Sequence, residues 1–212
     1  MAQKDGIKPY ILRDDVSCNL VHLVRDHSSK KAEDVFMEIL NSKTFKGGTG
    51  CIRDKFNCVC FSEAPISKLG QVLALPGVHG MRYKPFGFMV SKEWLYEKGG
   101  RPVIYQSDSE YSLLPGSLKY RHVRYEPPLI DFSWEREWRI QTNELQIDPA
   151  ITTVIVPNRS FVEKIKQDNI DKMGKEVQLM GMVTLGVLSH KPLKPLAWHF
   201  IVLEDLGIPI PN

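Results

Sequence analysis

The chain has 212 residues, of which 42% are hydrophobic and 25% charged, and this composition is typical of a globular protein rather than a disordered one. The length suits one domain over residues 1–212. A formal net charge of +3 permits a polyanionic partner without requiring one. The chain has no apolar run of membrane-spanning length and no apolar leader at its N-terminus, so we expect a cytoplasmic protein with no membrane partner.

The four cysteines are Cys18, Cys51, Cys58 and Cys60. Without a leader, we expect these thiols to stay reduced in the cytoplasm. Cys58 and Cys60 alternate within an apolar run, which fits two residues on the same face of a strand. Because the second CxxC or the HxxxH of a zinc site is missing, we expect structural thiols and no metal.

Short apolar runs and one helical repeat organise the first half of the chain. Apolar residues in 28–43 recur at the spacing of one helical face, with Ser28 or Ser29 as the candidate N-cap. Ser91 is placed to cap a later helix that Gly99 ends. The predicted strands are 19–25, 56–62, 86–90 and 101–106, and the predicted helices are 28–43, a short one from Pro65 and 91–100.

The second half of the chain begins with a poorly patterned run, 107–128, which predicts a long irregular loop. Ser160 and Glu163 have the spacing of a capping box for a helix over 158–168. The predicted strands are the WEREW strand, 152–157, 177–188 and 196–204. Together, these elements predict an α+β domain with a mixed, mostly antiparallel sheet and flanking helices.

The motif WEREW, residues 134–138, predicts a strand with two different faces. Successive side chains of a strand point to opposite sides, so the tryptophans would be buried on one face and two carboxylates would lie beside a guanidinium on the other. The first face comprises Trp134, Arg136, Trp138 and Ile140, and the second comprises Glu135, Glu137 and Arg139. Cross-strand ion pairs on an exposed face explain these charges as well, so the motif alone leaves both interpretations open.

Four motifs, in order, resemble the ADP-ribosyltransferase fold of the diphtheria-toxin and DNA-targeting toxin type. They are LVHLVR with His22, a helix ending in ILNSKTFKG, CVCFSEAP, and EREW. The stretches FSEAP, FGFMVSKEWL, GGRPVIY and WEREWR also resemble a group of bacterial proteins linked to abortive phage infection. The resemblance spans residues 19–141 and implies the split sheet of the ADP-ribosyltransferase type, with NAD as co-substrate.

The resemblance also implies roles for individual residues. Glu137 would be the catalytic carboxylate and Glu135 would face the acceptor, while His22 and Ser62 would hold the two riboses of NAD. Guanidinium matches phosphate geometry and aromatic rings stack on nicotinamide. The candidates for the pyrophosphate are Arg25, Arg101 and Arg139, and those for the nicotinamide are Tyr83, Phe86 and Tyr105.

Breaking the bond between ribose and nicotinamide develops positive charge on the sugar, which carboxylates stabilise. The chain lacks a G-x-G-x-x-G motif, as expected if NAD is consumed rather than used in redox chemistry. Val24 stands where related families often have threonine or serine, and the pair Phe61–Ser62 occupies the place of a tyrosine in the second motif. A non-catalytic partner or antitoxin module is therefore the alternative.

The run KYRHVRYEPP, residues 119–128, interleaves basic and aromatic side chains. Phosphate contacts and base stacking of this kind suit single-stranded nucleic acid, although a solvated loop explains the composition equally well. The candidate contacts are Lys119, Arg121, Arg124 and Tyr125. We therefore expect a toxin or phage-defence effector that modifies DNA or RNA, with a cognate antitoxin as a further partner. A protein acceptor is the nearest rival.

Overall fold

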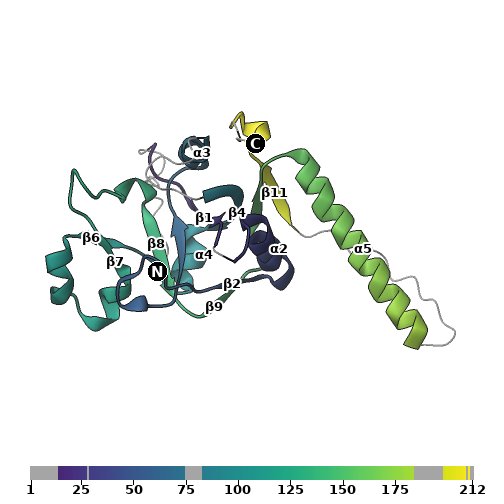
Figure 1. Cartoon of the computed structure of the whole chain (residues 1–212), viewed down its shortest axis with the longest axis horizontal. Helices are drawn as coiled ribbons and strands as arrows, with labels where there is room; N and C mark the ends of the chain where they lie inside the picture. Colours follow the sequence, from purple (N-terminus) through teal and green to yellow (C-terminus); the bar gives the residue numbers. More distant parts are fainter. Residues whose placement is uncertain (1–13, 28, 75–82, 184–197, 209, 211–212) are drawn as a thin grey trace, which may run out of the picture.

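The computed structural model describes residues 14–27, 29–74, 83–183, 198–208 and 210. A seven-stranded sheet forms the centre of the molecule, and its neighbouring strands are antiparallel except for the outermost pair at one edge (Figure 1). In spatial order the strands are β11 (His199–Val202), β10 (Thr153–Val156), β4 (Tyr83–Ser91), β1 (Asn19–Arg25), β3 (Cys58–Ser62), β8 (Glu137–Gln141) and β5 (Arg101–Pro102). The predicted α+β domain with a mostly antiparallel sheet is confirmed.

Helices and two small sheets surround this central sheet. The helices are α2 (Ala32–Ser42), α3 (Ile66–Ala74), α4 (Lys92–Glu97) and α5 (Arg159–Val183). The small sheets are the antiparallel pair β2 (Thr44–Lys46) and β9 (Glu144–Gln146) and the parallel pair β6 (Ile104–Gln106) and β7 (His122–Arg124). In Figure 1, the β6–β7 pair and α5 lie at opposite ends of the molecule.

The central sheet has an apolar cluster on each face. Leu20 and Val21 belong to different clusters, because successive side chains of β1 point to opposite sides. On one side, which we call the α2 face, Phe36 of α2 stacks on Phe88 with ring centroids 5.1 Å apart. On the other side, the α3 face, Leu69 of α3 joins the second cluster.

The helix predicted over 28–43 is observed as α2, but its N-cap differs from the prediction. Asp26 Oδ1 accepts the N–H of Ala32 at 2.9 Å, and this hydrogen bond lowers the pKa of Asp26. Ser28 lies outside the described residues. A carboxylate replaces a serine here because the chain from β1 brings Asp26 to the first turn of the helix, where an anion is favourable.

The predicted cap of α4 is confirmed, since Ser91 Oγ accepts the N–H of Trp94 at 3.1 Å. Gly99 follows the helix with φ of +100°, a conformation that glycine adopts without strain. The strand predicted over 101–106 is divided into β5 and β6 at Val103, whose N–H donates to the carbonyl of Glu137 at 2.9 Å. The run 107–128 is irregular as predicted, apart from the short strand β7.

The C-terminal third contains more helix than predicted. Helix α5 continues to Val183, so 177–183 is helical and not part of a strand, while 184–188 lies outside the described residues. An apolar run does not by itself distinguish a strand from a helix. Asn158 Oδ1 accepts the N–H of Phe161 at 3.0 Å and takes the capping position predicted for Ser160.

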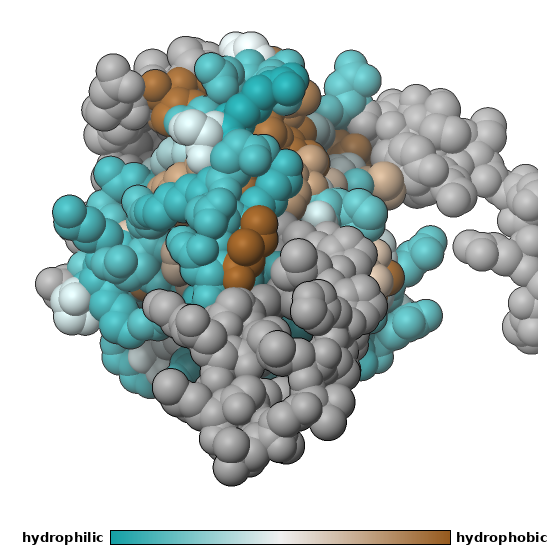
Figure 2. Space-filling model, turned by 90° about the vertical axis from the view of Figure 1, so that its right-hand side faces the viewer, coloured by the Kyte–Doolittle hydropathy of each residue, from teal (hydrophilic) through white to brown (hydrophobic). Residues whose placement is uncertain are grey.

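The outer side of the molecule near α5 carries mainly hydrophilic side chains among the coloured residues of Figure 2, with small hydrophobic patches between them. Ion pairs contribute to this surface, including Lys164 of α5 with Glu33 of α2 at 2.5 Å. Within the described part of the chain, no helix has the length and apolar character needed to cross a membrane.

Candidate functional site

The WEREW motif is not one continuous strand. Residues 133–135 form a 3₁₀ turn, Arg136 has a left-handed backbone with φ 46° and ψ 53°, and β8 begins only at Glu137. This conformation costs a residue with a side chain roughly 1–2 kcal/mol and interrupts the alternation of faces. Trp138 is therefore buried on the α2 face as predicted, whereas Trp134 packs against the cluster on the α3 face.

Glu137 and Arg139 lie next to each other on the α3 face of β8, as the alternation predicts. Arg139 Nε donates to Glu137 Oε1 at 2.8 Å and Nη2 donates to Oε2 at 3.0 Å. The two side chains are only 13% and 5% exposed. Charge-assisted pairs of this two-bond geometry are among the stronger interactions of side chains, so the position of the Glu137 carboxylate is well fixed.

Glu135 lies beside this pair in a different environment. Burial, and after it the negative charge of Glu137, raise the pKa of Glu135 to about 7. The hydrogen bond from Tyr83 and the positive charges of Arg139 and Arg25 act in the opposite direction. Near neutral pH, the Glu135 carboxyl is therefore shared between its protonated and ionised forms, which is the property required of a general acid or base.

Two tyrosines, both predicted to contact nicotinamide, border the glutamates. The Tyr83 hydroxyl donates to Glu135 Oε1 at 3.4 Å, and burial raises the pKa of this phenol well above its usual value. The Tyr105 hydroxyl accepts the N–H of Glu137 at 3.1 Å and donates to the carbonyl of Phe132 at 3.4 Å. Both phenols therefore have hydrogen-bonding roles within the site.

Strand β3 lies beside β8 and forms the floor of the site. Ser62 pairs with Glu137 across the two strands, and Cys60 pairs with Arg139. The Ser62 hydroxyl donates to the carbonyl of Glu135 and accepts the N–H of Ala64 at 3.2 Å. Ser62 thus holds the turn that carries Glu135, and the ribose contact predicted for it stays a prediction.

Burial strongly raises the pKa of the Cys60 thiol, and the charge of Glu137 adds to this effect. Cys58, on the same face of β3, has its pKa raised to about 11 for the same main reason. Both thiols are therefore protonated and unreactive at neutral pH, in agreement with a structural role. Among the described residues, no group of three or more candidate ligands could hold a metal ion.

Sequence reasoning missed Glu63, a buried carboxylate on the α2 face beside the turn. It forms an ion pair with Lys92, and its Oε2 accepts the indole N–H of Trp138 at 3.1 Å. Arg136 Nε lies 3.8 Å from the same oxygen. A buried tryptophan on a strand usually requires an acceptor for its N–H, and this requirement is the signal by which such a residue could have been found.

Arg25, predicted to bind pyrophosphate, extends from the end of β1 beside Tyr83, its partner across the strands. A Cβ added at Gly50 would lie 3.1 Å from Arg25 Nη2, so the glycine loop 47–50 approaches the guanidinium closely. Arg25 makes no hydrogen bond or ion pair with any residue that the structure describes. A guanidinium in this state is suited to an anion.

Three of the predicted NAD contacts do not join this group. His22 lies on the α2 face, where its ring is 4.7 Å from that of Phe45 and its Nδ1 donates to the Cys60 carbonyl at 2.8 Å. Burial lowers the pKa of His22. Phe86 packs against Phe161 on the same face, with centroids 4.9 Å apart. Both side chains lie on the opposite side of the central sheet from Glu137. The contacts of His22 and Phe86 with NAD stay predictions.

The third is Arg101, on the edge strand β5. Its guanidinium carbon lies 3.9 Å from the ring centroid of Tyr96, and Nη1 donates to the carbonyls of Tyr96 and Gly100 at 2.8 and 2.7 Å. Arg101 thus holds the loop that follows α4. A pyrophosphate contact would require it to leave these partners, and the predicted role stays untested.

The basic run 119–128 adjoins the site through its backbone. Arg139 Nη1 donates to the carbonyls of Tyr120 and His122 at 2.9 and 3.0 Å. The ring of Tyr125 lies 6.3 Å from that of Tyr105, centroid to centroid. The ion pair of Glu137 and Arg139 is therefore connected to the segment predicted to contact nucleic acid.

The basic side chains of this segment already have protein partners. Arg121 Nε donates to the Pro102 carbonyl at 2.8 Å, and Arg124 Nε donates to Glu126 Oε2 at 3.0 Å. Lys119 Nζ lies 4.9 Å from the centroid of the Tyr111 ring. Only Arg124 among the three is exposed, and Glu126 balances its charge.

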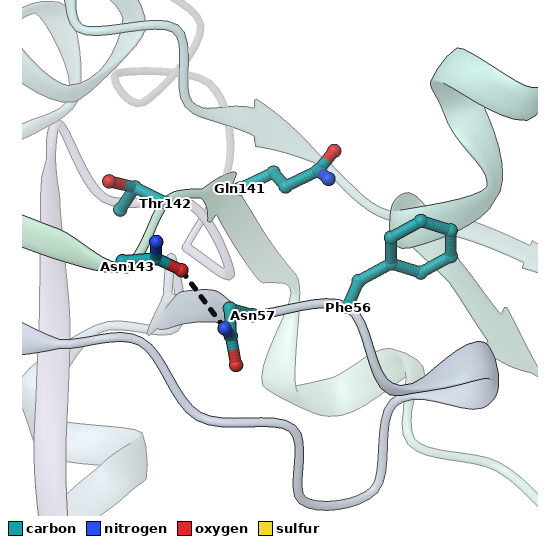
Figure 3. A pocket seen from close by; sticks show the side chains of 5 residues that line it. All are labelled: Phe56, Asn57, Gln141, Thr142 and Asn143. Carbon is teal, nitrogen blue, oxygen red and sulfur yellow. Dashed lines mark hydrogen bonds between the residues drawn. The ribbon is translucent and has the colours of Figure 1, made fainter.

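A separate pocket of about 370 Å³ lies at the other end of β3 and β8 (Figure 3). Asn57 and Asn143 are hydrogen-bonded across it at 2.9 Å, from Nδ2 to Oδ1. None of the residues that line it is ionisable; they are Phe56, Asn57, Gln141, Thr142 and Asn143. This pocket therefore lacks the acid, base and anion-binding groups that gather around Glu135.

Comparison with known proteins yields no family model, no curated protein and no solved structure that matches the chain. The α+β class is observed directly, whereas the ADP-ribosyltransferase type predicted from the motifs stays a prediction. The functional argument therefore depends on the cluster formed by Glu135, Glu137 and their neighbours.

Proposed function

We propose that the chain is an NAD-dependent mono-ADP-ribosyltransferase with Glu137 as its catalytic carboxylate. One observation carries the proposal: Glu137 is held in an ion pair by Arg139, while Glu135 beside it has a pKa raised to about 7. Two neighbouring carboxyl groups in different environments are the usual arrangement for breaking a glycosidic bond, because one stabilises positive charge while the other moves a proton.

Each residue has a defined task in this reaction. The bond from the ribose carbon to the nicotinamide nitrogen breaks, and its electron pair leaves with nicotinamide. Glu137 accepts a hydrogen bond from the 2′-hydroxyl and stabilises the positive charge on the ribose. Glu135, in its ionised form, takes the proton of the acceptor nucleophile as the new bond to the ribose carbon forms.

The anionic part of NAD fits the surroundings of Arg25. This guanidinium has no hydrogen-bonding partner among the described residues and lies beside the glycine loop 47–50, where backbone approaches closely. Tyr83 interacts with Arg25 and with both glutamates, and Tyr105 interacts with the two glutamates. Aromatic rings in this position suit the flat nicotinamide ring.

A non-catalytic partner or antitoxin module of the same fold is the second candidate. One observation favours it, namely that both oxygens of Glu137 are already bonded to Arg139. Each carboxylate oxygen can accept a further hydrogen bond, so the 2′-hydroxyl still has an acceptor. For this reason the catalytic function is the better supported of the two.

We further propose DNA or RNA as the acceptor, with the protein acting as a toxin or phage-defence effector. The support is the position of the segment 119–125, which Arg139 ties to the site and which brings Tyr125 toward Tyr105. Bases stack readily on tyrosine rings and Tyr125 is partly exposed, while Lys119, Arg121 and Arg124 would contact phosphates after exchanging their present partners.

The proposal is tested with NAD labelled in its ADP-ribose part and separate pools of DNA, RNA and cell protein. Wild type should transfer label to one nucleic-acid pool, and Glu137→Gln should transfer it roughly two to four orders of magnitude more slowly. Glu144→Gln is the matched control, because Glu144 is an exposed residue on β9. Label that appears only in protein rejects the nucleic-acid acceptor, and label in no pool rejects the transferase.

A further inference from the structure

Arg136 separates the two glutamates of the site and adopts a left-handed backbone, with φ 46° and ψ 53°. The turn 133–135 precedes it and the strand β8 follows it, so the change of direction between Glu135 and Glu137 occurs at this one residue. Residues other than glycine rarely adopt this backbone conformation unless the surrounding structure fixes them. The contacts of Arg136 should therefore explain why the turn is stable.

Both ends of Arg136 are held from outside the turn. Its backbone carbonyl accepts the N–H of Glu63 at 3.1 Å. Its Nη1 donates to Asp15 Oδ2 at 3.0 Å, and its Nε lies 3.8 Å from Glu63 Oε2. Glu63 is itself fixed by Lys92 and Trp138, and it is only 8% exposed. The guanidinium is thus hydrogen-bonded to Asp15 in the segment before β1 and lies within ion-pair distance of the buried Glu63, although Nε itself has no hydrogen-bonding partner among the described residues.

We propose that Arg136 is a positioning residue whose anchored guanidinium holds the Glu135 carboxyl beside Glu137 and Tyr83. Arg136 acts only through the turn and would not contact NAD or the acceptor. The inference deepens the proposed function and rests on it for the identity of the site, but the geometric claim can be tested without turnover. The turn is also held by Ser62, whose hydroxyl donates to the carbonyl of Glu135.

The protonation of Glu135 reports on this geometry. Glu137 and Arg139 face it from β8, and the facing groups on other strands are Tyr83 of β4, Arg25 of β1 and Tyr105 of β6. Burial is the main cause of its raised pKa, followed by the charge of Glu137. If the turn loosens, the carboxyl enters water and its pKa falls toward the ordinary value of 4.5.

The experiment is an NMR titration of the carboxyl carbons of labelled glutamate in the whole chain, with the Glu135 signal assigned by its loss in Glu135→Gln. Arg136→Gly removes the guanidinium and keeps the left-handed backbone, which glycine adopts without strain. The Glu135 midpoint should fall by about 1 unit or more in this variant, as its carboxyl becomes hydrated. An unchanged midpoint overturns the proposal.

Lys43→Gly is the matched control, because Lys43 also has a left-handed backbone, with φ 54°, but lies at the end of α2. This substitution should leave the Glu135 midpoint unchanged, and a fall of equal size there would contradict a specific role of Arg136. Circular dichroism checks that each variant is folded. If Arg136→Gly does not fold, Arg136→Lys replaces it. Lysine has fewer hydrogen-bond donors than arginine and should hold the turn less firmly, so the Glu135 midpoint should still fall. An unchanged midpoint in this variant overturns the proposal.

The titration separates this inference from the proposed function, because it uses no NAD. A lowered midpoint in Arg136→Gly, together with a wild type that transfers no ADP-ribose, rejects the transferase and keeps the positioning role. Transfer of ADP-ribose by wild type, together with an unchanged midpoint in Arg136→Gly, supports the transferase and rejects the positioning role. In an active enzyme, Arg136→Gly should lower kcat more than it raises KM, since Arg136 does not bind the substrate.

Discussion

Arg139 donates one pair of hydrogen bonds to the carboxylate of Glu137 and a second pair, through Nη1, to the carbonyls of the segment 119–125. A single buried guanidinium thus connects the candidate catalytic carboxylate with the candidate acceptor-binding segment. Because Arg139 is 5% exposed on its side chain, these contacts are shielded from solvent. Changes at Arg139 should therefore affect both regions together.

Arg139→Lys should destabilise the protein by roughly 1–3 kcal/mol, the cost of leaving a buried acceptor without its hydrogen bond. Lysine keeps the charge but lacks the planar fork that serves four acceptors. Urea unfolding measures the loss, and hydrogen exchange should show faster exchange of amides in 104–106 and 122–124, the strands β6 and β7. Faster exchange spread evenly over the protein would argue against a local connection.

Glu135 should make the protein less stable as the pH rises. Its pKa is about 7 in the folded state and 4.5 as an ordinary reference, so the folded state binds the proton more tightly between these values. The free energy of unfolding should fall by at most about 3 kcal/mol across this window and then level off. Glu135→Gln should lack this component, and identical pH profiles of the two proteins would contradict the raised pKa.

Trp138→Phe tests the hydrogen bond between the indole and Glu63. The ring remains apolar, but Glu63 Oε2 loses its donor at 3.1 Å and stays buried. We expect a loss of roughly 1–3 kcal/mol in the free energy of unfolding, the cost of an unsatisfied buried group. Trp94→Phe is the control, because the Trp94 side chain has no such contact among the described residues. Equal losses in both variants would point to packing alone.

The four cysteines should react at two different rates. Cys18 and Cys51 are exposed, whereas burial raises the pKa of the Cys58 thiol to about 11 and that of Cys60 even more strongly. In the native protein, iodoacetamide should label Cys18 and Cys51 first, as mass spectrometry of the peptides would show. Rapid labelling of Cys60 would mean that the floor of the site is open to solvent.

Periodicity was sufficient to predict much of the fold. The apolar run at 19–25 and the helical spacing within 28–43 predicted β1 and α2, because burial of one face leaves a direct pattern in the sequence. The cap at Ser91 was predicted for a similar local reason. The apolar run 177–183 was assigned to a strand because its composition fits either state, and helix α5 continues through it.

The candidate site was predicted only in part. Alternation placed Glu137 and Arg139 on one face of β8, and the structure shows them paired. The left-handed backbone of Arg136 had no sequence signal, because glycine and asparagine are the residues that usually mark this conformation. The interruption at Arg136 also explains why Trp134 and Trp138 lie on different faces.

The sequence motif around His22 also did not predict on which side of the sheet this residue lies. The apolar run 19–25 predicts a strand buried on both faces, and such a run does not indicate which face carries the site. The two faces are distinguished only by the packing of α2 and α3. Periodicity therefore predicted the strand β1 but not which of its faces lies beside Glu137.

The release of nicotinamide from NAD by wild type, Glu137→Gln and Glu144→Gln tests the central claim most directly. We predict release by wild type and by Glu144→Gln, and a decrease by roughly two to four orders of magnitude in Glu137→Gln, as expected for loss of one positioned catalytic group. Circular dichroism must show that Glu137→Gln is folded. Absence of release by wild type with DNA, RNA and protein present, or equal release by all three proteins, would contradict the account.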